Sequence, residues 1–283
     1  MNSLLPAQFV ALLRREVLEN RALFIAAPAV LALVLSVFAL WAISMAPGEQ
    51  LAAGVEYLSI MFDGLSPGEM APMFLMPAIP FIMMLYACVL IYLLNALYQD
   101  RKDLSVYFWQ SMPVSNLGTV LSKVVTVIAV VPAFYVAILF VVYLLAVTAL
   151  SLLGLSYDVE VAGLGYMFMA AVVSLLLFYV SAFLAALWLL PTIGWLLLFS
   201  AFAKRTPVMW ALGVFILLGL VEDLIFGTQF LGNWVESRSN FRQYIVLDFP
   251  MAMDRLFSYD MLFGLVVGAI LITGAVYMRR FVD

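Results

Sequence analysis

The side chains that most often carry out covalent chemistry in proteins are nearly absent from this sequence. It contains no histidine, which removes imidazole acid–base catalysis, Ser-His-Asp triads and histidine metal sites. Its single cysteine, Cys88, lies in the apolar run MMLYACVLIY and is expected to be an inert buried thiol. No P-loop pattern and no Gly-x-Gly-x-x-Gly occurs. We therefore expect no enzyme activity, no metal site and no cofactor on this chain, and any ATP that drives it would be bound by another polypeptide.

Two smaller features could serve transport or helix packing. Glu222 and Asp223 follow a long apolar run, where ionisable side chains are candidates for an outer gate or a substrate site. Two hydrated carboxylates at a membrane edge cost little, so a solvated pair is the alternative. Gly264 and Gly268 have the small-x-x-x-small spacing that lets two helices approach closely. Glycine is common in membrane helices, however, so this spacing also arises without an interface.

Aromatic side chains gather in the segment DRKDLSVYFWQSMPVSNLGTVLSK, at 100–123. Ser105 can cap a short helix and Pro113 should end it. This predicts a rigid helix of one or two turns that presents Phe108 and Trp109. Exposed aromatic clusters of this kind mark contact surfaces. An aromatic belt among the inner lipid headgroups is the alternative.

Membrane-spanning helices are the elements that must position these residues. Of the 283 residues, 67% are hydrophobic and 11% are charged, where soluble domains carry about 45–50% and about 25%. So few charges could not cover the surface of a soluble chain of this length, so its solvent is lipid. This excludes a cytosolic enzyme and a secreted domain. The net charge of −4 also argues against a nucleic-acid partner, which needs a basic face.

We predict an all-α polytopic membrane protein, with residues 1–283 forming a single transmembrane domain. The expected spans are 22–46, 73–97, 123–153, 163–203, 206–222 and 261–278. The fourth is unusually long because no charge interrupts residues 161–203. Two short crossings joined at Pro191 would leave too few residues before Lys204 to cross. We therefore expect one span that is kinked near Pro191 or partly interfacial.

The Lys and Arg residues orient these spans. With the N-terminus inside, only Arg238, Arg242 and Arg255 of the 13 Lys and Arg residues fall outside. Both termini are therefore expected in the cytoplasm, and seven spans would satisfy this rule slightly less well. The outer segment 222–260 mixes acidic and aromatic residues, which predicts interfacial or re-entrant helices, with an ordinary ordered loop as the alternative.

The segment before the first span has the pattern of an amphipathic helix lying in the inner interface. Its apolar face carries Phe9, Val10, Leu12, Leu13 and Val17. Gln8, Arg15 and Glu19 face away from it. Such a helix could couple cytoplasmic motion to the first span, or it could be a passive basic anchor.

Several short motifs resemble those of permease subunits in the type-2 family of ABC (ATP-binding cassette) exporters. In the loop after span two they are Asp100-Arg101, Phe108-Trp109, Ser111-Met112-Pro113-Val114-Ser115 and Val120-Leu121-Ser122-Lys123. Near the end of span four they are Leu190-Pro191, Trp195, Ser200-Ala201-Phe202, Arg205 and Pro207. Met112 stands where the family more often has leucine, a near-isosteric change.

The resemblance implies an architecture of two permease subunits above two copies of a separate ATPase subunit that holds ATP and Mg. We expect a homodimer, and a heterodimer with a second permease is equally compatible with the residues. It implies a coupling helix that contacts the ATPase and a connecting helix formed by the N-terminal amphipathic segment. The coupling-helix residues would be Leu104, Ser105, Tyr107, Phe108, Trp109, Gln110, Ser111, Met112, Pro113, Val114 and Ser115. The chain would be a multi-pass protein of a bacterial cytoplasmic membrane that moves its cargo by alternating access.

Two other classes remain open from the residues themselves. One is an ATPase-independent secondary transporter or channel, although the spans offer few ionisable residues for an ion relay. The other is a membrane scaffold, or an intramembrane enzyme built on a serine or a carboxylate. The cargo is not identified by the sequence.

Overall fold

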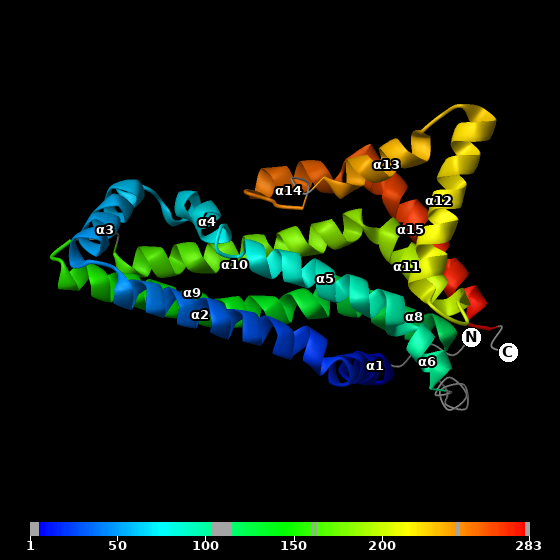
Figure 1. The fold of residues 1–283 in the computed structure, drawn as a ribbon, viewed down its shortest axis with the longest axis horizontal. Coiled ribbons are helices and arrows are strands. Elements are labelled where there is room, and N and C mark those ends of the chain that lie inside the picture. The colour runs from blue at the N-terminus through cyan, green and yellow to red at the C-terminus, as the bar shows by residue number, and fades with distance from the viewer. Residues whose placement is uncertain (1–5, 104–114, 160, 162, 241–243, 281–283) are drawn as a thin grey trace. The chain divides into compact units, whose positions relative to one another are not determined.

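The computed structural model describes residues 6–103, 115–159, 161, 163–240 and 244–280 (Figure 1). Within these ranges the chain is helical and contains no strand. The elements of the first half are α1 (Pro6–Glu19), η1 (Ala22–Ala26), α2 (Ala27–Met45), α3 (Gly48–Phe62), α4 (Pro67–Leu75), α5 (Ile79–Ala96), α6 (Tyr98–Lys102) and α8 (Asn116–Val125). Those of the second half are η2 (Thr126–Val130), α9 (Val131–Ser156), α10 (Leu164–Trp188), α11 (Leu190–Phe202), α12 (Pro207–Phe226), α13 (Phe230–Ser239), α14 (Phe249–Leu256) and α15 (Tyr259–Met278). The all-α fold class is confirmed for the described residues.

Six stretches of helix are long and apolar enough to cross a membrane, as predicted. They are Ala22–Met45, Ile79–Lys102, Asn116–Ser156, Leu164–Trp188, Pro207–Phe226 and Tyr259–Met278. The second begins later than the expected Met73 because the separate helix α4 precedes it. A capping box of Ser66 and Glu69 starts α4, and in it the Glu69 carboxylate accepts a hydrogen bond from the Ser66 backbone N–H. The chain is a multi-pass membrane protein by this length and composition.

The long fourth run is broken close to Pro191, where we expected a kink. Helix α10 reaches span length by itself, and the helical path breaks at Leu189, whose φ and ψ are −87° and 10°. Pro191 then lies in the first turn of α11, where its missing N–H leaves no helical hydrogen bond unmade. The run is therefore one span followed by a second, shorter helix.

The chain divides into two compact units, which we describe separately. The first comprises Met1–Arg21, Tyr86–Val131 and Ser181–Asp283. The second comprises Ala22–Leu85 and Pro132–Val180. Two of the boundaries fall inside α5 and α10, so neither unit is an independent stretch of sequence.

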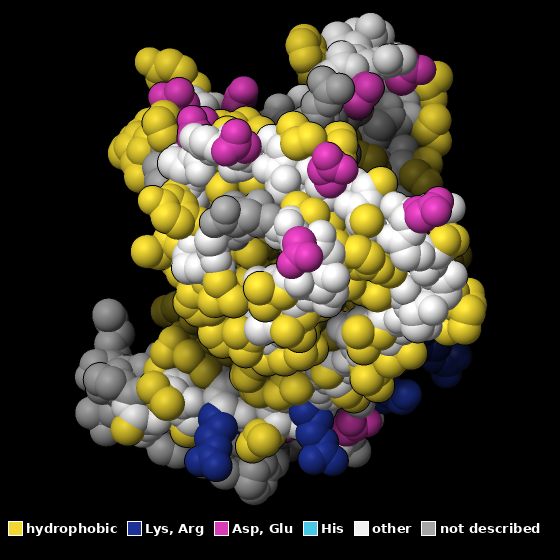
Figure 2. Space-filling view, turned by 90° about the vertical axis from the view of Figure 1, so that its left-hand side faces the viewer, with side chains coloured by type: hydrophobic (Ala, Val, Ile, Leu, Met, Phe, Trp, Pro, Cys, Tyr) yellow, Lys and Arg dark blue, Asp and Glu magenta, His cyan; other side chains and the backbone are white. Residues whose placement is uncertain are grey.

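The second unit packs around aromatic side chains. The ring of Phe74 on α4 lies 6.3 Å from that of Phe62 and 5.8 Å from that of Tyr143, measured between centroids. Tyr143 also donates its hydroxyl hydrogen to the Phe74 carbonyl. Helix α2 of this unit leaves most of its apolar side chains exposed, Leu33 by 64%. Figure 2, which views the left-hand side of Figure 1, shows many hydrophobic side chains with several Asp and Glu side chains among them.

The first unit is built around the close packing of α11 on α15, the most extensive helix contact in the described chain. A Cβ on Gly268 would lie 2.7 Å from the Leu190 side chain, and one on Gly194 would lie 2.8 Å from that of Leu271. Gly194 and Gly268 therefore let the two backbones approach, and only Gly268 belongs to the small-x-x-x-small pair. This unit also contains every residue of the candidate site.

Candidate functional site

The expected coupling helix lies largely outside the described residues. These are Leu104, Ser105, Tyr107, Phe108, Trp109, Gln110, Ser111, Met112, Pro113 and Val114. Ser115, which follows them, is the N-cap of α8, and its hydroxyl oxygen accepts a hydrogen bond from the Gly118 N–H at 3.1 Å. The structure thus describes the two flanks of the loop, α6 before it and α8 after it.

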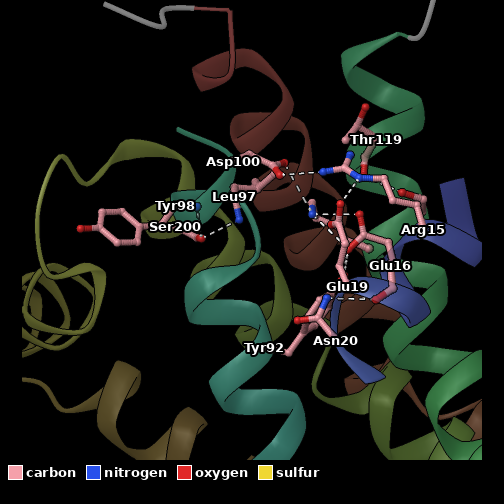
Figure 3. A network of polar contacts seen from close by, with 12 residues as sticks. Arg15, Glu16, Glu19, Asn20, Tyr92, Leu97, Tyr98, Asp100, Thr119 and Ser200 are labelled. Atoms are coloured by element: carbon pink, nitrogen blue, oxygen red, sulfur yellow. Dashed lines mark hydrogen bonds and ion pairs between the residues drawn. The ribbon is translucent and has the colours of Figure 1, made fainter. Parts of the chain in front are cut away.

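A buried ion pair joins α1 to α8. The Lys123 ammonium donates to both Glu16 carboxylate oxygens, at 3.0 and 3.1 Å, and both side chains are almost fully buried. The Tyr92 hydroxyl of α5 donates to the same carboxylate at 2.6 Å. Figure 3 shows Glu16 and Tyr92 in this region, together with the neighbouring Arg15 and Asp100. A buried charge without a partner costs several kcal/mol. Glu16 and Lys123 must therefore both be present for these groups to hold α1, α5 and α8 together.

Asp100 of α6 extends the pair into a network. Its carboxylate accepts from the Arg15 guanidinium at 3.1 Å and lies 3.6 Å from the Lys123 ammonium. The guanidinium of Arg279, which follows α15, is 3.8 Å away. Arg15 also donates to Glu19, one helical turn further along α1. Three cations therefore face three carboxylates, so the charges of the cluster balance, with Glu19 about half exposed at its edge.

Arg279 shows the electrostatic cost of this arrangement. Burial of its guanidinium lowers the pKa, and the neighbouring Asp100 carboxylate opposes that shift. An arginine remains charged under such a shift because its ordinary pKa is far above neutral. The end of α15 is therefore attached to α6 by a charge that persists at physiological pH.

Helix α1 buries or half-buries most of the predicted apolar face, Phe9, Leu12, Leu13 and Val17, but not Val10. Leu12 and Glu16, one turn apart, are its buried residues, whereas Val10 is 61% exposed. Arg15, expected to face away, is turned toward Asp100. The ion pairs draw the charged side of the helix inward, which the spacing of its apolar residues did not reveal. The pattern of apolar residues therefore did not indicate Glu16, or its partners Tyr92 and Arg279 on other segments, as site residues.

A second set of contacts joins α6 to the end of α11. The Ser200 hydroxyl oxygen accepts from the backbone N–H groups of Leu97 and Tyr98, both at 3.0 Å, where α5 gives way to α6. Arg101 donates to the Phe202 carbonyl at 3.2 Å and to the Ala201 carbonyl. A cation at the C-terminal carbonyls of a helix is favourable. Two motifs that are distant in the sequence, Asp100-Arg101 and Ser200-Ala201-Phe202, thus meet in the structure.

The remaining motif residues mark the turn between α11 and α12. Arg205 is exposed in this turn. Thr206 follows it with a φ of 46°, in the left-handed region, and Pro207 begins α12. Pro191 and Pro207 each lie in the first turn of a helix, where the fixed φ and missing N–H of proline suit the backbone.

Glu222 caps the next helix. Its carboxylate accepts from the Thr228 hydroxyl and the Leu231 N–H, both at 3.0 Å, and from the Phe230 N–H. These are groups at the N-terminus of α13, where a carboxylate also meets the positive end of the helix dipole. The side chain holds the α12–α13 turn. Asp223 contributes its carbonyl to the same turn, accepting from the Gly227 N–H.

Arg238 of α13 is a buried cation that the sequence placed only in an outer segment. Its guanidinium carbon lies 4.5 Å from the Trp188 ring centroid and 4.6 Å from that of Trp234. It donates to the Trp188 and Asp260 carbonyls, and burial lowers its pKa. A Cβ on Gly264 would lie 2.5 Å from this guanidinium. Gly264 therefore makes room for Arg238, while Gly268 makes room for α11.

A polar cavity of about 570 Å³ opens beside the ion-pair network. Besides the network residues, Asn20, Asn95, Gln99 and Asp103 line it. It is bounded by the helices that flank the loop at 104–114. Comparison of the chain with protein-family models, curated proteins and solved structures found no match.

Proposed function

We propose that the chain is the membrane-spanning permease subunit of an ATP-binding cassette exporter. It would move its cargo across the cytoplasmic membrane by alternating access, with both termini on the cytoplasmic side. A separate ATPase, in two copies, would bind ATP and Mg, and a second permease copy would complete the pathway. The motif resemblance in the 100–123 loop and the 190–207 segment supports this proposal, together with six span-length helices.

The observation that carries the proposal is the anchoring of the loop at both ends. Asp100 of α6 precedes the segment 104–114, and Lys123 of α8 follows it. Both side chains form ion pairs with α1, through Arg15 and Glu16. A partner that moved the loop would therefore move α1, α6 and α8 as one body. This is the mechanical property that a loop receiving force from an ATPase requires, and a passive headgroup belt would not need it.

The proposal predicts that the loop aromatics are needed for ATPase coupling but not for folding. The chain would be expressed with a candidate ATPase subunit from the same source, and co-purification and ATP turnover in lipid would be measured. Trp109→Ala and Pro113→Gly should lower assembly or stimulated turnover at least about tenfold, the loss of a contact-surface anchor. Trp41→Ala, on the exposed face of α2, is the matched control and should leave both unchanged.

Normal assembly and normal stimulated turnover in both loop variants would contradict the proposal that this loop couples the chain to an ATPase. Transport that persists in ATP-free vesicles under an ion gradient would instead favour a secondary transporter. The two outcomes can be distinguished because co-purification and ATP turnover report on the ATPase partner, whereas transport in ATP-free vesicles reports on the energy source.

A further inference from the structure

Helix α1 has a second face, opposite the one that carries the ion-pair network. Leu12 and Glu16 are buried on the network side. Val10, Arg14 and Leu18 follow one another at intervals of four residues, so they form a single stripe along the helix. All three side chains are exposed, Val10 by 61% and Leu18 by 59%. The stripe therefore faces the surroundings of the protein and not its interior.

The charge on this stripe is positive. Arg14 lies at its middle, and Arg21 follows shortly after the end of α1; both are exposed. Neither side chain forms a hydrogen bond or an ion pair within the described part of the chain. The exposed carboxylate of Glu19 is turned to Arg15 instead, at 2.7 Å. Arg14 and Arg21 are therefore available to anions from outside the chain.

The connection to the first span keeps this stripe close to the membrane. That span begins at Ala22, directly after Arg21. Arg14 precedes Arg21 by two helical turns, or about 10 Å at a rise of 1.5 Å per residue. Polar headgroups border the hydrocarbon on each side, so a helix lying along the interface places both guanidinium groups among them. Exposed Val10 and Leu18 favour that orientation, because contact with water would cost the free energy of two apolar side chains.

We propose that the stripe of Val10, Arg14 and Leu18, together with Arg21, binds the headgroups of anionic phospholipids. The two guanidinium groups donate to phosphate oxygens, for which the planar fork of arginine is suited. Val10 and Leu18 contact the acyl chains next to those headgroups. The partner is thus a negatively charged membrane surface, and not lipid in general. The site needs only that the chain is a membrane protein, so it stands or falls independently of any ATPase partner.

This stripe is not the apolar face that the sequence predicted for the same helix. Most of that predicted face is buried or half-buried against the protein. The lipid-facing side is defined instead by two exposed apolar residues with an arginine between them. Headgroup contact would therefore act on the helix whose other side carries Arg15 and Glu16 of the network.

Native mass spectrometry of the delipidated full-length protein tests the site, with phosphatidylglycerol and phosphatidylcholine of identical acyl chains as probes. The wild type should bind the first phosphatidylglycerol more tightly than the first phosphatidylcholine, and a higher ionic strength should reduce the difference. The double variant Arg14→Gln with Arg21→Gln should lose about tenfold or more of this preference, equivalent to about 1.4 kcal/mol. Leu18→Gln keeps both cations and should weaken the binding of both lipids alike.

The chain provides a control of equal charge. Lys102→Gln with Lys204→Gln removes two exposed cations that lie outside α1, and it should keep the wild-type preference. Glycerol 1-phosphate, which carries the phosphate without acyl chains, should not displace the bound lipid. An unchanged preference in the arginine variant, an equal loss in the lysine variant, or displacement by glycerol 1-phosphate would overturn the site. A lower melting temperature of the arginine variant in lipid-free detergent would also overturn it, by assigning the arginines to contacts within the protein.

Discussion

Lys123 is the residue on which the candidate site depends most. Its ammonium is shared between Glu16 and Asp100, and it is almost completely buried. The Glu16 and Asp100 carboxylates compensate for the hydration that the ammonium loses on burial. The same reasoning applies to Glu16, which would be left as an isolated buried anion without Lys123. Removing one member of the network alone therefore costs more stability than removing it together with its partner of opposite charge.

At this scale we predict that Lys123→Met destabilises the protein by about 3–5 kcal/mol, because it leaves two buried carboxylates without their shared cation. Lys102→Met, which removes an exposed lysine of α6, should change stability by less than about 0.5 kcal/mol. The free energy of unfolding would be measured by denaturant titration in mixed micelles.

The double variant Glu16→Met with Lys123→Met separates pairing from burial. It should be less destabilised than the sum of the two single variants, because both charges leave together. A strictly additive result would mean that the two side chains do not interact as the 3.0 Å contact indicates.

Among the elements, α11 and α15 illustrate how far sequence patterns reach. The spacing of Gly264 and Gly268 predicted close helix packing, and the structure places α11 against Gly268. The pattern could not show that Gly264 instead faces Arg238, because that contact depends on where α13 lies. Likewise the proline at 191 indicated a break, but the backbone leaves the helical path at Leu189. Local spacing predicts that an element packs closely; the partner is set by tertiary structure.

The corresponding prediction concerns Gly268→Ala. Its added methyl group would collide with the Leu190 backbone carbon at 2.8 Å, so α11 must shift, at a cost of about 1–3 kcal/mol. Gly213→Ala in α12 is the control, because its Cβ would meet open space. That variant should stabilise the helix by roughly 0.5–1 kcal/mol, as alanine does at an unhindered helical position. Thermal unfolding of both variants, followed by circular dichroism in detergent, makes the comparison.

For the whole molecule, composition was enough to predict the helical membrane class and six spans, because a 20-residue apolar run has few other outcomes. The ion-pair network was predictable only in part. Asp100 and Lys123 stood out in a motif, whereas Glu16 and Arg279 lie among other charged residues in ordinary terminal segments. Their burial follows from contacts between segments far apart in the sequence, which one chain's spacing does not encode. The same holds for Arg238, whose two tryptophan neighbours lie on different helices.

The orientation of the spans is the prediction that belongs to the entire chain. Cys88 is buried, so replacing it by serine gives a background for single-cysteine labelling in sealed inside-out and right-side-out vesicles. The distribution of Lys and Arg predicts that Lys102→Cys and Lys204→Cys react from the cytoplasmic side. Glu56→Cys and Asp254→Cys, in segments between the expected outer span ends, should react from the opposite side. Labelling of Lys204→Cys and Asp254→Cys from one side would mean that α12 does not cross the membrane, and the six-span arrangement would then be wrong.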